Sequence, residues 1–330
     1  MPVLIERCPG ERDLVCGGFL GWDAIAHLHR LGLDPAALGA RPIDRLRLAS
    51  RGRVVETALP RAAAGLSRRR LDAALLGMAE EAGTTVLRGR AARAIEEGRV
   101  RLDDGEEIEA GALFLATGKH ELRGAARETG RRPVSVGLRA ALPASPALAA
   151  ALAGTIELHL FDGGYAGLLV QEDGAVNLCL SVERARMTGT PSALLAELIG
   201  EAPLLGERIG AALPERWEAV AGVPYGWRAL GTEPGRYRIG DQAAVIASLA
   251  GDGIAVALAS GAAAARACLQ GGGAGAGAYQ HAFARRARRP LAIAEMLRHM
   301  AENPLGRALM MRLAGLPGLA KAAASLTRIG

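Results

Sequence analysis

One stretch decides the fold class: Arg238-Ile239-Gly240-Asp241-Gln242-Ala243-Ala244, then Gly251-Asp252-Gly253-Ile254 and an Ala-rich run to Leu269. It predicts a strand, a Gly-Asp turn and a helix that begins between glycines. The glycines let backbone N–H groups approach a ligand closely, and the helix start offers partial positive charge to an electron-rich group. The Asp241 carboxylate can accept hydrogen bonds from a polyol. The alternative is a plain strand-turn-helix in which an aspartate caps the helix.

The amino-terminal residues predict a buried strand that ends in an acid. Pro2-Val3-Leu4-Ile5-Glu6-Arg7 is a short apolar run closed by Glu6. In a dinucleotide-binding βαβ unit the second strand ends in this way, and its carboxylate holds ribose hydroxyls about 20 residues after a Gly-rich turn. Only five residues precede Glu6, so we expect that turn to lie outside the given sequence. An exposed acid at a strand end is the alternative interpretation.

Hydrophobic periodicity predicts an α/β unit at each end of the chain and a β-rich part between them. Expected helices cover residues 22–33, 68–82, 146–152, 191–199, 204–213 and 253–269. Expected strands cover residues 46–49, 54–59, 85–87, 100–102, 107–109, 112–116, 156–161, 167–171 and 175–180. Gly271 to Gly277 is expected to be a Gly/Ala linker, and the chain from Tyr279 onward to be helical.

Composition narrows the class of protein. No run of 18 or more apolar residues lacks a charge, so a membrane-spanning helix is not expected. Aromatic residues make up 3% of the chain, too few for a nucleic-acid site built on stacking. The four cysteines show no metal-type or disulfide pattern, and His27 and His29 point to different helix faces, so no metal site is expected. These features favour a reducing, cytoplasmic setting.

Five segments, in chain order, carry a resemblance to one protein family. They are Val3 to Arg7 with Val15-Cys16-Gly17-Gly18-Phe19-Leu20; Gly65-Leu66-Ser67-Arg68 with Leu71-Asp72; Leu115-Ala116-Thr117-Gly118; Gly163 to Gly167 with Gly174 to Asn177; and the stretch from Arg238 to Ile254. Together they resemble the FAD-dependent oxidoreductases of the geranylgeranyl reductase and aromatic hydroxylase (p-hydroxybenzoate hydroxylase-like) superfamily. The likeness covers roughly residues 2 to 265.

The resemblance implies an α/β fold with three parts. A Rossmann-like FAD-binding domain, N-terminally truncated because its GxGxxG segment is missing, is expected at residues 1–130 and 225–270. An inserted β-rich substrate domain is expected at residues 131–224, and a helical C-terminal tail at residues 271–330.

The resemblance also implies noncovalent FAD and assigns residues to it. Glu6 is expected at the adenosine ribose, Arg68 and Asp241 near the ribityl-pyrophosphate region, and Gly251 to Ile254 at the N1/O2 edge of the ring. The full expected cofactor-binding set is Glu6, Arg7, Cys16, Gly17, Arg68, Thr117, Gly118, Gly240, Asp241, Gly251, Asp252, Gly253 and Ile254. Gly164 and Tyr165 are expected to border the substrate, and no residue stands out as an acid or base catalyst.

The expected function is an FAD-dependent oxidoreductase that reduces or hydroxylates a prenyl, quinone or polyketide-like small molecule. Thr117 stands where aromatic hydroxylases commonly have an aspartate, so NAD(P)H and another electron donor both stay open. The Trp-x-Trp-x-Ile-Pro signature of flavin halogenases is absent from the sequence. The alternatives are a truncated, non-catalytic flavoprotein remnant and a flavin monooxygenase of secondary metabolism.

The tail from Pro290 to Gly330 alternates apolar runs with basic residues such as Arg298, Arg312 and Lys321. An amphipathic basic helix of this kind can lie on a membrane surface, which gives the expectation of a peripheral membrane contact. Packing on the chain's own body or on a second subunit is the alternative. No nucleic-acid partner is expected.

Overall fold

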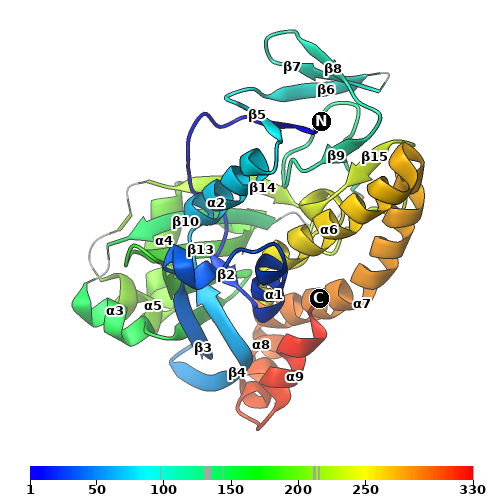
Figure 1. Ribbon diagram of the computed structural model, residues 1–330. Helices are drawn as coiled ribbons and strands as arrows, with labels where there is room; N and C mark the ends of the chain where they lie inside the picture. The colour runs from blue at the N-terminus through cyan, green and yellow to red at the C-terminus, as the bar shows by residue number, and fades with distance from the viewer. Residues whose placement is uncertain (97, 130–134, 144, 211–212, 215, 330) are drawn as a thin grey trace.

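The computed structural model describes residues 1–96, 98–129, 135–143, 145–210, 213–214 and 216–329. It shows a mixed α/β architecture with two sheet-containing parts and a run of C-terminal helices that contacts both (Figure 1). The predicted domain boundary at residues 130 and 131 lies outside the described residues, as do residues 211 and 212 of one expected helix.

Two pairs of short parallel strands form the centre of the first part. β1 (Val3–Glu6) pairs with β5 (Thr85–Arg88), and β9 (Leu113–Leu115) pairs with β15 (Arg236–Arg238). The helices α1 (Trp22–Arg30), α2 (Arg68–Glu81) and α6 (Gly253–Gly271) belong to this part. The strand expected at the start of the chain is confirmed, but it is not buried, because Val3 is 46% exposed and the other residues of β1 are partly exposed. The strand-turn-helix after Arg236 is confirmed. Because β9 and β15 are parallel, the loops that follow them leave the pair at the same edge.

A small antiparallel sheet lies beside these strands. It consists of β6 (Ala92–Glu96), β7 (Arg99–Leu102) and β8 (Glu107–Glu109), and Asp104 and Gly105 lie in the turn between the last two. The strand β6 was not expected from the sequence. Its apolar residues pack with Ile5 and Leu115, so the small sheet covers one side of the parallel strands.

The second part is an eight-stranded sheet in the order β14-β10-β13-β12-β11-β3-β4-β2. Its strands are β2 (Phe19–Leu20), β3 (Arg41–Ser50), β4 (Arg53–Gly65), β10 (Ser135–Leu142), β11 (Thr155–Phe161), β12 (Gly164–Val170), β13 (Val176–Glu183) and β14 (Glu218–Val223). All neighbouring pairs are antiparallel except β11 with β3. The helices α3 (Pro146–Leu152), α4 (Pro191–Glu201) and α5 (Pro203–Ile209) pack their leucines into a core with β10, β12 and β13.

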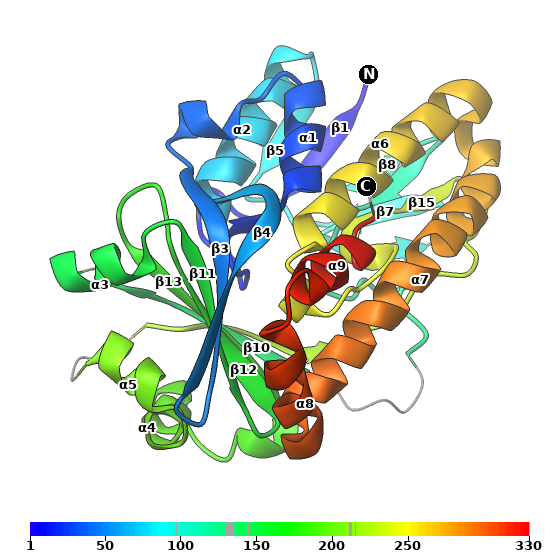
Figure 2. The same ribbon diagram turned by 90° about the horizontal axis from the view of Figure 1, so that it is seen from below.

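The C-terminal helices follow α6 with little interruption. They are α7 (Ala276–Glu302), α8 (Pro304–Ala314) and α9 (Leu319–Leu326). Figure 2 shows α8 and α9 between α7 and the β3–β4 hairpin, and both helices contact β4. The helical tail is confirmed, but the Gly/Ala linker expected at 271–277 is wrong, because Gly272–Gly275 forms a 3₁₀ turn that joins α6 to α7.

Candidate functional site

A cavity of about 770 Å³ lies where the two parts and the C-terminal helices meet. The loops after β9 and β15, the start of α6 and the segment around Cys16 form one end of it. The inner face of the eight-stranded sheet and the helices α7, α8 and α9 form the other end. One space therefore joins residues from widely separated parts of the sequence.

The start of α6 presents bare backbone to the cavity. Gly251, Gly253 and Ile254 line it, and Gly251 has a left-handed φ of 68°. A Cβ on Gly251 would lie 2.8 Å from Phe19 Cδ1, so the turn has room only for glycine. No side chain caps the helix, and its first N–H groups lack helical acceptors. This end of α6 can therefore bind an anionic or electron-rich group.

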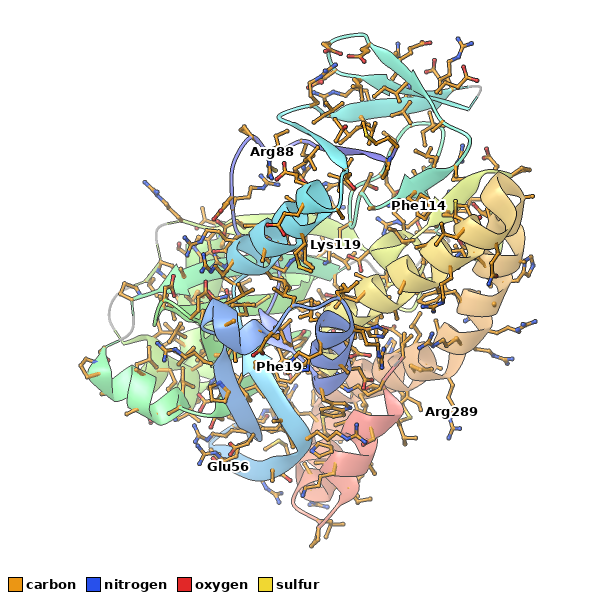
Figure 3. The ribbon with its side chains drawn as sticks, in the orientation of Figure 1. Phe19, Glu56, Arg88, Phe114, Lys119 and Arg289 are labelled. Carbon is orange, nitrogen blue, oxygen red and sulfur yellow. The ribbon has the colours of Figure 1, made fainter. Side chains whose placement is uncertain are left out.

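A partly buried ion pair lies next to this helix start. Lys119 Nζ lies 3.2 Å from Asp241 Oδ2, and both residues line the cavity. Figure 3 shows Lys119 in the middle of the molecule, between α2 and α6. The charge of Asp241 raises the pKa of Lys119 well above its ordinary value, so the lysine keeps its proton. The pair offers one cation and one carboxylate to a polyol or phosphate.

Arg127 holds the two loops that carry this pair. Its guanidinium donates to the carbonyl oxygens of Lys119 and Asp241 at 2.8 and 3.1 Å, and Gln242 donates to that of Gly118 at 3.1 Å. Arg127 is buried and pairs with Glu121. The loops after β9 and β15 are thus fixed to each other by hydrogen bonds.

Arg68, at the first turn of α2, also lines the cavity. Its guanidinium forms a two-pronged pair with Asp72, at 2.9 and 2.8 Å. Burial by itself would lower the pKa of Arg68, but the charge of Asp72 outweighs it and the net shift is upward. Ser67 caps α2 by accepting from the N–H of Arg70, which fixes where the helix begins.

The segment around Cys16 is tied to the eight-stranded sheet. Asn177 on β13 donates its amide hydrogens to the carbonyl oxygens of Cys16 and Gly17, at 3.0 and 2.8 Å. Arg139 on β10 donates to Asn177 at 2.7 Å and pairs with Asp13 at 2.9 Å. These contacts hold the backbone of Cys16 and Gly17 at the cavity wall.

A chain of hydroxyl groups crosses the cavity wall. Tyr165 Oη donates to Ser248 Oγ at 2.5 Å, and Ser248 Oγ lies 2.7 Å from Tyr225 Oη. Tyr225 Oη in turn lies 3.2 Å from Ser181 Oγ. Burial raises the pKa of both tyrosines, that of Tyr165 well above its ordinary value, so both phenols stay protonated at neutral pH. The chain therefore presents protonated hydroxyl groups to the cavity.

The other end of the cavity is apolar. Sheet residues Leu46, Leu48, Ile156 and Leu158 face helix residues there, and the helix residues are Ile293, Leu297, Met300, Met310, Leu313, Leu319 and Ala323. Cys179 lies on the sheet side, and burial raises the pKa of its thiol to about 12. A thiol that keeps its proton is a poor nucleophile, so this cysteine is a packing residue.

Most of the expected site residues meet at this cavity. Those that line it are Cys16, Gly17, Arg68, Gly118, Tyr165, Gly240, Asp241, Gly251, Gly253 and Ile254. Glu6, Arg7, Thr117, Gly164 and Asp252 do not line it.

Local contacts explain four of these five positions. Glu6 accepts from the N–H of Cys8 at 2.8 Å, and Arg7 lies 2.7 Å from His120 Nε2. Thr117 donates to the carbonyl of His120 at 2.8 Å. The carboxylate of Asp252 is buried and binds the C-terminal segment at Arg328 and Ile329.

Lys119, Tyr225 and Ser248 were missed by the sequence analysis. They lie in three separate segments, and nothing in the local pattern of any of them marks a site. In the described part of the chain, no three His, Cys, Asp or Glu residues are grouped so that they could hold a metal ion.

Comparisons with known proteins identify the fold. A geranylgeranyl bacteriochlorophyll reductase-like protein from Thermoplasma acidophilum matches with a TM-score of 0.76 and 17% identity, over 98% of this chain and 88% of its own. PqsL, a probable FAD-dependent monooxygenase from Pseudomonas aeruginosa, matches with a TM-score of 0.70 and 18% identity, over 94% and 92%. A variant of the halogenase PltM, solved in complex with FAD, matches with a TM-score of 0.71 and 13% identity, over 89% and 70%. No protein-family model and no curated protein sequence matches the chain.

Proposed function

Because this chain has the fold of FAD-dependent monooxygenases, halogenases and geranylgeranyl reductase-like proteins, we propose that it is an FAD-dependent oxidoreductase acting on an apolar small molecule. In this proposal FAD binds noncovalently at the polar end of the cavity, and a prenyl, quinone or polyketide-like substrate occupies the apolar end. Its setting is cytoplasmic or at a membrane surface.

The observation that carries the proposal is the division of one cavity into two chemically different ends. Lys119, Asp241 and Arg68 line one end together with the uncapped start of α6, and leucine and methionine side chains line the other. A cofactor with a polar tail and a planar ring fits the first end, and an apolar substrate fits the second. Both ends open into the same space, so the two molecules would meet.

The residues at the polar end fit FAD by their chemistry. The N–H groups at the start of α6 would face the electron-rich edge of the ring, and Asp241 would accept hydrogen bonds from the ribityl hydroxyls. Arg68 and Lys119 would balance phosphate charge. The glycines at 17, 240, 251 and 253 leave the backbone free of side chains where a flat ring would lie.

Bound FAD would supply hydride transfer or oxygen chemistry. The protein would orient the reactants, donate a proton and exclude water. Tyr165 and Tyr225 hold protons on oxygen atoms within the cavity, where the reduction of a C=C bond needs a proton on one carbon. Apolar residues of α7 and α9 exclude water from the same space. The hydroxyl chain favours reduction, with hydroxylation as the second candidate.

Reconstitution with FAD tests the proposal. The purified protein is incubated with FAD, passed through gel filtration and examined for the visible spectrum of oxidised flavin. Retained flavin that is released on heat denaturation supports noncovalent binding, and a colourless protein contradicts the proposal and favours the non-catalytic remnant. Anaerobic photoreduction followed by addition of isoprenoid, quinone or polyketide acceptors then separates reduction, which proceeds without oxygen, from hydroxylation, which does not.

A further inference from the structure

The helix α8 exposes its apolar face to solvent. Leu305, Leu309 and Leu313 recur at intervals of four residues and are 84%, 50% and 38% exposed. On the other side of the same helix Arg307 and Met311 are buried, and Arg307 pairs with Asp162. A helix on the surface of a soluble protein normally turns its apolar face inward. Within the described part of the chain, no packing partner therefore covers the exposed leucines of α8.

The apolar cavity reaches the surface at the same place. Met296, Leu313, Leu319 and Leu326 line the cavity and are each more than one third exposed. These four residues belong to α7, α8 and α9, so the same helices form the cavity wall and carry accessible apolar side chains. A cavity mouth on this side of the wall would lie beside the apolar surface that Leu305 and Leu309 form.

Positive charge is concentrated on the same helices. Residues 276–330 contain nine basic and two acidic residues, whereas residues 1–275 contain 31 basic and 32 acidic residues. Both acidic residues of the tail, Glu295 and Glu302, pair with Arg298. The remaining exposed cations have no ion-pair partner in the described part of the chain, and they are Arg285, Arg286, Arg288, Arg289, Arg312 and Lys321.

The charged and apolar residues share one side of α7. Arg285, Arg289 and Met296 recur at intervals of four and seven residues, which places them on one face of the helix. Figure 3 shows Arg289 pointing away from the body of the molecule. Apolar side chains with unpaired cations beside them match a bilayer surface. The acyl chains of the bilayer would take the apolar side chains, and the lipid phosphates would take the cations.

We propose that the surface formed by α7, α8 and α9 binds membranes that contain anionic phospholipids, with the leucines of α8 among the acyl chains and the arginines of α7 at the phosphates. Binding rests on the exposed residues alone. The consequence that an apolar substrate passes from the bilayer into the cavity mouth rests also on the proposed function. A second copy of this chain is a poorer occupant, because a two-fold interface would bring identical basic surfaces together.

The chain lies on the membrane in this proposal and does not cross it. By length and composition the segment Gly253–Glu302 contains one window apolar enough to span a bilayer. However, Val256, Ala259 and Ala264 of α6 are buried in a core with Tyr237 and residues of α7. Removing α6 from that core would unfold the first part of the molecule.

Vesicle sedimentation tests the proposal with the full-length chain. The protein is expected to pellet with vesicles of phosphatidylcholine and phosphatidylglycerol and to stay in solution with phosphatidylcholine alone. Leu305→Ser/Leu309→Ser should reduce the partition coefficient about tenfold or more, since each leucine loses several buried carbons. Arg285→Gln/Arg289→Gln should reduce it about tenfold or more through lost attraction to anionic lipid.

Matched controls remove the same residue types elsewhere. Leu230→Ser and Leu269→Ser replace exposed leucines outside the C-terminal helices, and Arg70→Gln/Arg184→Gln replaces exposed arginines without ion pairs in the described residues. These variants should bind vesicles like the parent chain. Equal binding to both kinds of vesicle, or unchanged binding of the two test variants, would overturn the proposal. A dimer in light scattering that Leu305→Ser/Leu309→Ser dissociates, without vesicle binding, would assign the surface to a second copy instead.

Flavin content is measured separately on the same samples. Vesicle binding needs no FAD, so loss of vesicle binding with retained flavin rejects only the membrane surface. A colourless protein that still binds anionic vesicles rejects only the proposed enzyme.

Discussion

Lys119 Nζ and Asp241 Oδ2, 3.2 Å apart, join the loops that follow β9 and β15 at the polar end of the cavity. The two residues are more than 100 positions apart in the sequence, and the parallel pairing of their strands brings them together. Both side chains are largely buried, so each depends on the other for its counter-charge. A ligand in the cavity would meet this pair as a fixed, overall neutral group of donors and acceptors.

Asp241→Asn is expected to weaken FAD binding by about tenfold to a hundredfold. The change removes a charged acceptor for polyol hydrogen bonds, each worth about 1.5–3 kcal/mol, and leaves Lys119 without its partner. Titration of flavin fluorescence against protein measures the affinity. Asp173→Asn is the control, because Asp173 is an exposed aspartate that pairs with Arg69 outside the cavity. Unchanged affinity of the Asp241 variant would place the flavin elsewhere.

Gly251→Val is expected to destabilise the chain by about 3 kcal/mol and to abolish FAD retention. Valine disfavours the left-handed backbone, and its Cβ would lie 2.8 Å from Phe19 Cδ1. Gly77→Ala in α2 is the control, because a Cβ there meets no atom within 4 Å. Alanine should stabilise that helix by about 0.5–1 kcal/mol. Urea unfolding gives both values, and equal stability of the two variants would refute the role of Gly251.

The sequence predicted much of the fold because strands and helices leave local patterns. The strands near Leu46 and Val54 were found, although β3 and β4 extend further at both ends. The glycines before Tyr279 were misread as a linker. A Cβ on Gly275 would lie 2.6 Å from the carbonyl oxygen of Ala267, and one on Gly273 equally close to that of Gly111. These glycines allow the backbone segments to pack closely. Because a flexible linker has the same glycine-rich composition, the sequence alone does not separate the two cases.

The site was predicted only where the chain carries a local motif. Asp241, Gly251 and Gly253 belong to one such motif and line the cavity. Asp252 belongs to the same motif, yet its carboxylate binds Arg328, 76 residues further along the chain. No local sequence pattern predicts the pairing of Asp252 with Arg328, because only the tertiary fold brings the two residues together.

Tyr165→Phe is expected to lower turnover about a hundredfold while FAD affinity stays within about twofold. Loss of the phenol removes the proton donor from the Tyr165–Ser248–Tyr225 chain and leaves the ring in place. Stopped-flow oxidation of photoreduced enzyme by an accepted substrate measures the step. Tyr279→Phe is the control, because its hydroxyl donates to the carbonyl of Arg238 and the residue does not line the cavity. Equal rates for the two variants would exclude proton transfer through Tyr165.

Asp252 is expected to make stability depend on pH. Burial raises its pKa to about 6, against the opposing charge of Arg328 and with a smaller contribution from Asp23. The folded chain therefore binds more protons than the unfolded chain between pH 3.8 and about 6, and the free energy of unfolding falls as the pH rises through this window. The expected total is about 3 kcal/mol, and the curve is flat above the window.

Asp252→Asn cannot titrate and should remove that slope. Urea unfolding of both proteins from about pH 4 to about pH 7 gives the difference between the two curves. Other groups, such as Glu157 with a pKa of about 2, titrate equally in both proteins and cancel in this difference. A difference that does not change with pH would show that Asp252 has the same pKa in the folded and the unfolded chain.

Arg328→Ala is expected to destabilise the chain by about 3–5 kcal/mol, because it leaves the buried Asp252 carboxylate without its cation. Arg328 Nη1 donates to Asp252 Oδ1 at 2.7 Å, and the guanidinium carbon lies 4.1 Å from the centre of the Trp22 ring. If the orphaned charge causes the loss, Arg328→Ala/Asp252→Asn should recover most of it. If lost packing on Trp22 causes it, the double variant should be as unstable as the single one.

Exposed Arg312, which has no ion pair in the described residues, provides the control, and Arg312→Ala should change stability by less than about 0.5 kcal/mol. Limited proteolysis within residues 315–318 gives a second measurement, since Arg328 and Ile329 anchor the end of α9 to the turn before α6. Faster cleavage in Arg328→Ala is expected. Because α9 lines the cavity, Arg328→Ala should also release FAD faster than the parent chain. Equal release rates would mean that α9 closes the cavity without the contact between Arg328 and Asp252.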